Sequence, residues 1–150
     1  MIESGAAEIL LVEDSPDDVE LTLRALRRAH IANRIHVARD GEEALTFLLG
    51  DGTTPPRRED DMPAVILLDV KLPKVDGLEV LRRIKGHAAT RAVPVVMLTS
   101  SNESRDVAAA YQLGVNSYIV KPVNFEQFAS SVVQLGMYWL LINRAANGTK

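Results

Sequence analysis

Short apolar runs recur along this chain, and polar residues follow each of them. The run at 64–68 consists of five apolar residues and leads directly into Asp69. An unbroken run of this kind is typical of a strand that is buried on both faces, as in the centre of a parallel sheet. Ligands of open α/β sheets bind at the carboxyl ends of the strands. Asp69 is therefore a candidate for chemistry, the alternative being an aspartate that only caps the next turn.

The rest of the pattern predicts strands and helices in strict alternation. Strands are expected at 8–12, 34–38, 64–69, 95–98 and 116–120. Helices are expected at 16–29, 41–49, 78–85, 104–113 and from 125 to as far as 143. This alternation is typical of one parallel sheet that is covered by helices on both faces through right-handed crossovers.

Residues that favour helix starts precede the helical segments. Ser15 before a proline, Asp76 with Glu79 three residues later, and Asn124 with Gln127 all have the spacing of N-caps. The segment 50–63 contains glycines, prolines and mixed charges and fits neither periodicity, so it is expected to form a long surface loop.

Composition narrows the functional classes. A length of 150 residues fits one domain, and the net charge of −3 argues against a protein that binds nucleic acid. The absence of cysteine excludes disulfides and thiolate metal sites. No leader pattern and no apolar run of membrane-spanning length is present, so we expect a cytoplasmic protein without membrane contact.

Parallel strands place their carboxyl ends at one edge of the sheet, and the polar residues there come from four strands. They are Glu13, Asp14, Asp69, Thr99 and Lys121. Three neighbouring carboxylates repel one another, and a hard divalent cation, most plausibly Mg²⁺, would relieve the repulsion. The lysine and the threonine would supply donors for phosphoryl oxygens, so the edge predicts a phosphoryl-transfer site. A purely structural acid cluster would leave the convergence of the polar strand ends unexplained.

The same residues resemble a known motif set across nearly the whole chain. It consists of Glu13-Asp14, Asp69, Leu72-Pro73, Asp76-Gly77, Thr99 and Lys121-Pro122. This set is similar to that of the receiver domains of two-component response regulators. The resemblance implies a flavodoxin-like (βα)5 fold of strand order 2-1-3-4-5, in which Asp69 accepts a phosphoryl group from the phosphohistidine of a sensor kinase.

The resemblance also implies roles for individual residues at the metal site. Asp14, Asp69 and the carbonyl of Lys71 would bind Mg²⁺, and Glu13 would act on it through water. Glu13 stands where many receivers have aspartate, and Lys71 places a long cation beside the acceptor. Both departures bear on the lifetime of the phosphorylated form.

The predicted catalytic residues are Asp69, Thr99 and Lys121. By the resemblance, Lys121 would pair with the phosphoryl oxygens and Thr99 would hydrogen-bond one of them. Tyr118 would turn inward on activation, so that Thr99 and Tyr118 would form the switch. The bond between Lys121 and Pro122 would be cis, as in similar receivers. The chain would catalyse only its own phosphotransfer and dephosphorylation.

A narrower likeness concerns the partner. The segment 12–18, the loop before the Asp69 strand and the ending 138–143 are similar to single-domain regulators paired with bacterial and cyanobacterial phytochrome histidine kinases. A phytochrome is therefore the expected kinase. Since the chain ends shortly after its fifth helix, we expect a signalling module that acts through protein contacts.

Two other functions share part of this pattern. A phosphatase of the haloacid-dehalogenase kind also phosphorylates a strand-end aspartate, but it uses a second acid two residues later, where this chain has Lys71. A receiver-like scaffold that works without phosphorylation would not need the acids, Thr99 and Lys121.

The last predicted helix has more apolar surface than one core-facing stripe needs. In the run 132–142 only Gln134 and Gly136 are not apolar, and Met137 and Leu141 lie outside the core stripe. A helix that is apolar all round is covered all round. We expect a twofold-symmetric homodimer through this helix, the fifth strand and the fourth helix, with a kinase or target surface on a monomer as the rival explanation.

Overall fold

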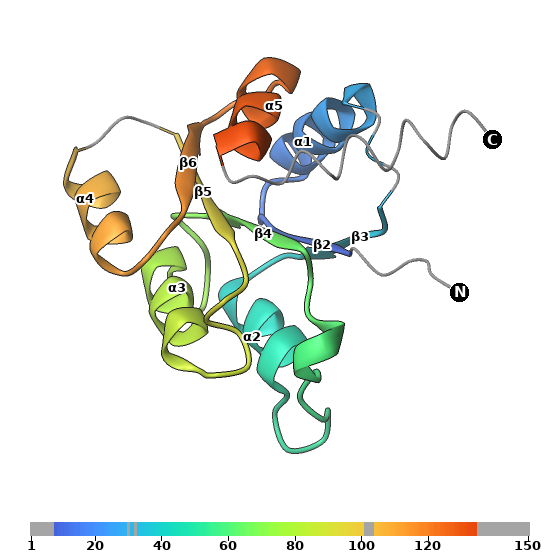
Figure 1. Cartoon of the computed structure of the whole chain (residues 1–150), viewed down its shortest axis with the longest axis vertical. Coiled ribbons are helices and arrows are strands. Elements are labelled where there is room, and N and C mark those ends of the chain that lie inside the picture. The colour runs from blue at the N-terminus through green and yellow to red at the C-terminus, as the bar shows by residue number, and fades with distance from the viewer. Residues whose placement is uncertain (1–7, 30, 32, 101–103, 135–150) are drawn as a thin grey trace.

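The computed structural model of the chain describes residues 8–29, 31, 33–100 and 104–134. These residues form a single sheet of five parallel strands (Figure 1). The strands are β2 (Ile9–Val12), β3 (Ile35–Ala38), β4 (Val65–Asp69), β5 (Val95–Thr99) and β6 (Ser117–Val120). Their order in the sheet is β3-β2-β4-β5-β6. Counted along the chain this is 2-1-3-4-5, so the predicted fold is confirmed.

Helices cover both faces of the sheet, as the alternating pattern predicted (Figure 1). They are α1 (Pro16–Arg28), α2 (Gly41–Leu49), α3 (Gly77–Gly86), α4 (Ser104–Gln112) and α5 (Phe125–Gln134). Apolar residues of α1 and α5 pack on one face, and those of α2, α3 and α4 pack on the other.

The central strand β4 explains why its sequence is apolar without alternation. Val65 and Leu67 face the α1 and α5 layer, whereas Ile66 and Leu68 face the opposite layer. All four side chains are almost completely buried. A strand between two helical layers needs apolar residues at every position, and this places β4 at the centre of the domain.

Several helix starts have the caps that the sequence predicted. The hydroxyl of Ser15 accepts from the backbone N–H of Asp18 at 3.3 Å, and the amide oxygen of Asn124 accepts from that of Gln127 at 2.8 Å. Asp76 also caps its helix, but Glu79 binds the side chains of the helix's own arginines at 82 and 83. In a capping box the backbone N–H of Asp76 would also donate to Glu79. Here the Glu79 carboxylate accepts from the two guanidinium groups instead, because they are stronger partners one turn away.

The segment 50–63 is a mostly exposed loop, as predicted, but it is not featureless. It contains a short 3₁₀ turn at Glu59–Asp61. The guanidinium of Arg57 lies 3.9 Å from the centroid of the Phe47 ring in α2 and forms an ion pair of 3.3 Å with Glu8. The loop is therefore fastened to α2 and to the start of β2, next to the amino end of β4.

The predicted extension of the last helix to residue 143 lies outside the described residues, which end at Gln134. The same is true of Met137 and Leu141, on which the expected homodimer depends. None of the helices in the described part of the chain is long and apolar enough to span a membrane.

Candidate functional site

The carboxyl ends of four strands meet at one edge of the sheet. Glu13 and Asp14 follow β2, Asp69 is the last residue of β4, Thr99 is the last residue of β5, and Lys121 follows β6. The parallel register pairs Asp69 with Leu98 and Thr99 with Val120, so these strands end within one residue of each other. The structure thus brings to one edge the five polar residues that the sequence predicted there.

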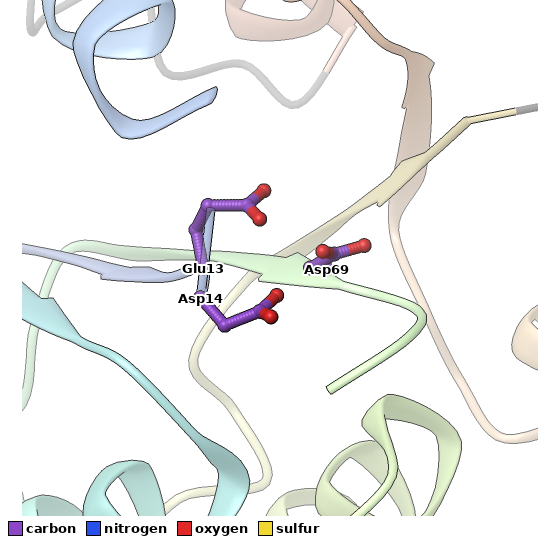
Figure 2. Close-up of side chains that lie close together, drawn as sticks. All are labelled: Glu13, Asp14 and Asp69. Carbon is purple, nitrogen blue, oxygen red and sulfur yellow. The ribbon is translucent and has the colours of Figure 1, made fainter. Parts of the chain in front are cut away.

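Three carboxylates form the centre of this edge. Glu13, Asp14 and Asp69 each have an oxygen atom within 4.8 Å of the other two. Figure 2 shows the side chains of Glu13 and Asp14 leaving the chain at the end of β2 on opposite sides, with both carboxylates directed towards Asp69. Glu13 is completely buried and Asp69 is 4% exposed, whereas Asp14 is open to solvent. One side of the cluster therefore lies in the protein and the other lies in water.

Burial changes the acidity of Glu13. Loss of hydration raises its pKa to about 7, and the charge of Asp69 and a hydrogen bond with it contribute in the same direction. The backbone N–H of Ser15 at 3.2 Å and the ammonium of Lys121 lower the pKa in part. The raised pKa thus reflects first the burial of Glu13 and second its closeness to Asp69.

This donor set fits a hard divalent cation. Three carboxylate oxygens from two neighbouring strands crowd together, and one of the three groups remains open to water, which such ions retain as ligands. A cation would also offset the part of the Glu13 pKa rise that comes from the charge of Asp69. The three acids can therefore hold a divalent metal.

Lys121 follows the edge strand β6, and its side chain reaches the acids at the ends of β2 and β4. Its ammonium donates to Glu13 at 3.1 Å, to Asp18 at 2.9 Å and to Asp69 at 3.1 Å. The bond from Lys121 to Pro122 is cis, as the sequence predicted. Burial by itself lowers the pKa of Lys121, but the hydrogen bond to Asp18 and the charge of Asp69 outweigh it and raise the pKa above its ordinary value. The side chain is thus held as a cation among three acidic side chains.

Asp18 is the residue of this site that sequence reasoning missed. Acids are common in the first turn of a helix because they interact favourably with the helix dipole, so an aspartate at this position does not by itself indicate a functional site. A signal was present, because the Ser15 cap and the following proline start the helix immediately after the acids of β2. An acid in that first turn therefore faces the same edge of the sheet as Lys121.

The loop after β4 approaches Asp69 through its backbone. The N–H of Lys71 donates to Asp69 at 3.3 Å, while the Lys71 side chain is exposed. Gly77, at the start of α3, leaves no room for a Cβ atom, which would collide with the carbonyl oxygen of Asp69. Gly41, at the start of α2, is in the same position against the carbonyl of Val75. The backbone of the loop that carries Lys71 therefore packs directly against the first residues of α2 and α3.

The two residues predicted to act as a switch lie on β5 and β6. Thr99 is 4% exposed, and its carbonyl accepts the backbone N–H of Lys121 at 2.7 Å. Tyr118 is half-buried and meets Tyr111 of α4 edge-on, with 6.1 Å between the ring centroids. A path of contacts thus leads from the acid edge along β6 to α4.

Comparison with known proteins identifies the class. Residues 9–133 match the model of the response regulator receiver domain, and the chain belongs to this family. It is a receiver domain, the phosphoryl acceptor of two-component signalling, and receiver domains accept the phosphoryl group from histidine kinases. The family assignment confirms the resemblance and sets aside the dehalogenase-type alternative.

Its relatives include a bacteriophytochrome response regulator. The chain is 40% identical to the response regulator Rcp1 of Synechocystis over 134 residues, which cover 88% of each protein. The solved structure of the bacteriophytochrome response regulator AtBRR is 53% identical, with a TM-score of 0.77 over 89% of this chain and 94% of that one.

Two further comparisons bear on the partner and the metal. The probable methanogenesis regulatory protein FilR2 of Methanothrix harundinacea is 44% identical over 140 residues, which cover 91% of this chain and 86% of that protein. A solved structure of Rcp1 is an Mn²⁺-bound form, with a TM-score of 0.71 over 89% of this chain and 94% of that one.

Proposed function

We propose that Asp69 is the residue that accepts the phosphoryl group. One observation carries the proposal: the Asp69 carboxylate lies at the carboxyl end of the central strand, with one oxygen bound by Lys121 and the other by the backbone N–H of Lys71. Glu13 and Asp14 each have a carboxylate oxygen within 4.8 Å of an Asp69 oxygen. Asp69 is thus the carboxylate on which the cation and the metal-binding acids converge.

The reaction is a phosphoryl exchange. A carboxylate oxygen of Asp69 forms a bond to phosphorus while the bond from phosphorus to the imidazole nitrogen of the kinase phosphohistidine breaks. The electron pair of that bond stays on the imidazole. Hydrolysis by water later returns the carboxylate and releases phosphate. Beyond this exchange on itself, the chain is proposed to have no enzymatic activity.

Mg²⁺ is the proposed cofactor, held by Asp14, Asp69 and the carbonyl of Lys71, with Glu13 acting through water. When bound, it would neutralise charge on the phosphoryl oxygens. The Mn²⁺-bound form of Rcp1 and the carboxylate donors of this chain support a divalent cation here.

Three other residues complete the proposal. Lys121 exchanges its hydrogen bond to Asp69 for one to a phosphoryl oxygen, because the negative charge then lies on the phosphoryl group. Thr99, at the end of the neighbouring strand, donates its hydroxyl to another phosphoryl oxygen. Tyr118 then turns inward, and because it contacts Tyr111, this movement reaches α4.

The proposed kinase is a phytochrome, on the strength of the likeness to AtBRR and Rcp1. The likeness to FilR2 makes a kinase of another sensory class the alternative. Initial rates of transfer from an autophosphorylated phytochrome kinase and from an unrelated kinase, at equal concentration, decide between them. We expect the phytochrome kinase to be faster, and equal rates would contradict this assignment.

The acceptor is tested by incubating the protein with acetyl phosphate and Mg²⁺ and measuring the intact mass. Wild type should gain one phosphoryl group, and Asp69→Asn should gain none. The matched control is Asp76→Asn, which changes an exposed aspartate of the same loop and keeps a good helix cap. A phosphoryl group on Asp69→Asn would disprove the assignment.

A further inference from the structure

The Lys121 ammonium is fully engaged before any phosphoryl group arrives. An ammonium has three N–H donors, and here they go to Glu13, Asp18 and Asp69. The bond to Asp18 is the shortest of the three, at 2.9 Å. Among the described residues, no other side chain outside the acid cluster is an acceptor of Lys121. Asp18 therefore differs in kind from the other two partners.

The local sequence places Asp18 at this point. The backbone N–H of Ser15 donates to Glu13, and the Ser15 hydroxyl accepts from the N–H of Asp18. These two bonds tie the first turn of α1 to the acid that follows β2. The Asp18 side chain is only 29% exposed, whereas its neighbour Asp17 lies on the solvent side of the turn. The hydrogen bonds at the start of α1 thus fix where the Asp18 carboxylate lies.

The chemistry of the site separates the three acceptors. Glu13 and Asp69 belong to the group of carboxylates that can hold a metal, and Asp69 also takes the phosphoryl group in the proposed function. Both therefore change their charge or their partners during the reaction. Asp18 lies outside the metal group and keeps its carboxylate unchanged throughout. It is the one acceptor that can hold Lys121 from the beginning of the reaction to the end.

We propose that Asp18 is a positioning residue, which anchors the Lys121 ammonium beside Asp69 while the metal and the phosphoryl group rearrange its other partners. This inference rests on the proposed function of Asp69. Asp18 acts through Lys121, whose ammonium donates to the acceptor carboxylate. The first helix is thereby tied to the reacting residue through two side chains.

A simple charge effect would act in the opposite direction. Asp18 is a fourth negative charge near a site that must accept a phosphoryl dianion, so its removal reduces repulsion. If charge alone mattered, Asp18→Asn would speed phosphorylation. If Asp18 positions Lys121, the same substitution slows it, because an amide oxygen is a weaker acceptor for an ammonium than a carboxylate. The two explanations therefore differ in sign.

The experiment measures initial rates of phosphorylation by acetyl phosphate at saturating Mg²⁺ in the full chain. Asp17→Asn is the matched control, since it makes the same charge change in the same turn without touching Lys121. We expect Asp18→Asn to be about tenfold slower than wild type, the loss of one charge-assisted hydrogen bond. Asp17→Asn should stay within about twofold.

A double-mutant cycle identifies the route of the effect. The Asp18→Asn substitution is repeated in a Lys121→Gln background, where its effect on the rate should disappear. Undiminished slowing in that background would overturn the inference, as would an Asp18→Asn protein as fast as wild type or as Asp17→Asn. These outcomes leave Asp69 as acceptor untouched. Wild-type protein that takes no phosphoryl group would overturn the proposed function and this inference with it.

Discussion

Asp69→Asn should make the metal-free protein more stable, although it removes an ion pair. In the absence of metal, the Asp69 carboxylate lies within 4.8 Å of two other acids and 3.1 Å from Lys121. With an effective dielectric constant of about 20, each repulsion is worth at least about 3.5 kcal/mol and the attraction about 5 kcal/mol. Neutralising Asp69 therefore gives a net gain of about 2 kcal/mol. The asparagine oxygen still accepts a hydrogen bond from Lys121.

The measurement is a urea titration followed by circular dichroism at pH 8 in EDTA, where Glu13 is ionised. Asp69→Asn should have the higher urea midpoint with an unchanged slope. Adding Mg²⁺ should then stabilise the wild type by about 2.7 kcal/mol at one hundred times its dissociation constant, and the variant by less, since it lacks one ligand. The difference between the two proteins should shrink or reverse.

Two results would refute this reasoning. A variant that is less stable than wild type in EDTA would mean that the pair with Lys121 outweighs the crowding of the acids. An equal response of both proteins to Mg²⁺ would mean that Asp69 is not a ligand. The control is Asp76→Asn, which should follow the wild type under both conditions because Asp76 is outside the acid cluster.

Three further predictions concern Glu13, Gly77 and the last predicted helix. The folded protein holds a proton on Glu13 up to about pH 7, whereas the unfolded chain releases it near pH 4.5. The free energy of unfolding in EDTA should therefore fall by about 3 kcal/mol as the pH rises between these values. Urea titrations should show a weaker dependence of stability on pH for Glu13→Gln, and the same dependence as in wild type would contradict the raised pKa. Gly77→Ala should weaken Mg²⁺ binding, measured by the metal-dependent rise in melting temperature, because the new methyl group displaces the Asp69 carbonyl. The control Gly86→Ala, where a Cβ atom has open space and the backbone does not have a positive φ, should leave Mg²⁺ binding unchanged. Met137→Glu with Leu141→Glu should give a folded monomer in sedimentation if the last helix forms the dimer, and wild-type protein that is already monomeric would contradict the dimer.

The features that depend on local pattern were predictable from the sequence. Continuous apolar runs such as 64–68 identify strands buried on two faces, and the parallel order of those strands then brings Asp69 and Lys121 to one edge without any knowledge of side-chain positions. Helix caps such as Ser15 are equally local, since the acceptor lies three residues from its donor. These signals do not depend on packing.

Features that depend on packing across the sheet were not predictable. The bond between Asp18 and Lys121 joins residues 103 positions apart. It forms only when the fold brings the start of α1 next to the end of β6. The fastening of Arg57 on Phe47 requires a loop conformation that no periodicity encodes. In the same way, Glu79 has a cap and two arginines within reach, and only the side-chain geometry decides which it binds.

The anchored loop 50–63 has a consequence for engineering. It leads into the amino end of β4, and the four residue steps from Val65 to Asp69 separate it from the acceptor by about 13 Å of strand. The entropic cost of lengthening a loop grows only with the logarithm of its length. Gly52, exposed and with no neighbour within 4 Å of its side-chain position, is thus a place where a fluorescent tag or a tethered domain can be inserted. The contacts of Arg57 with Phe47 and Glu8 lie between this position and β4 along the chain.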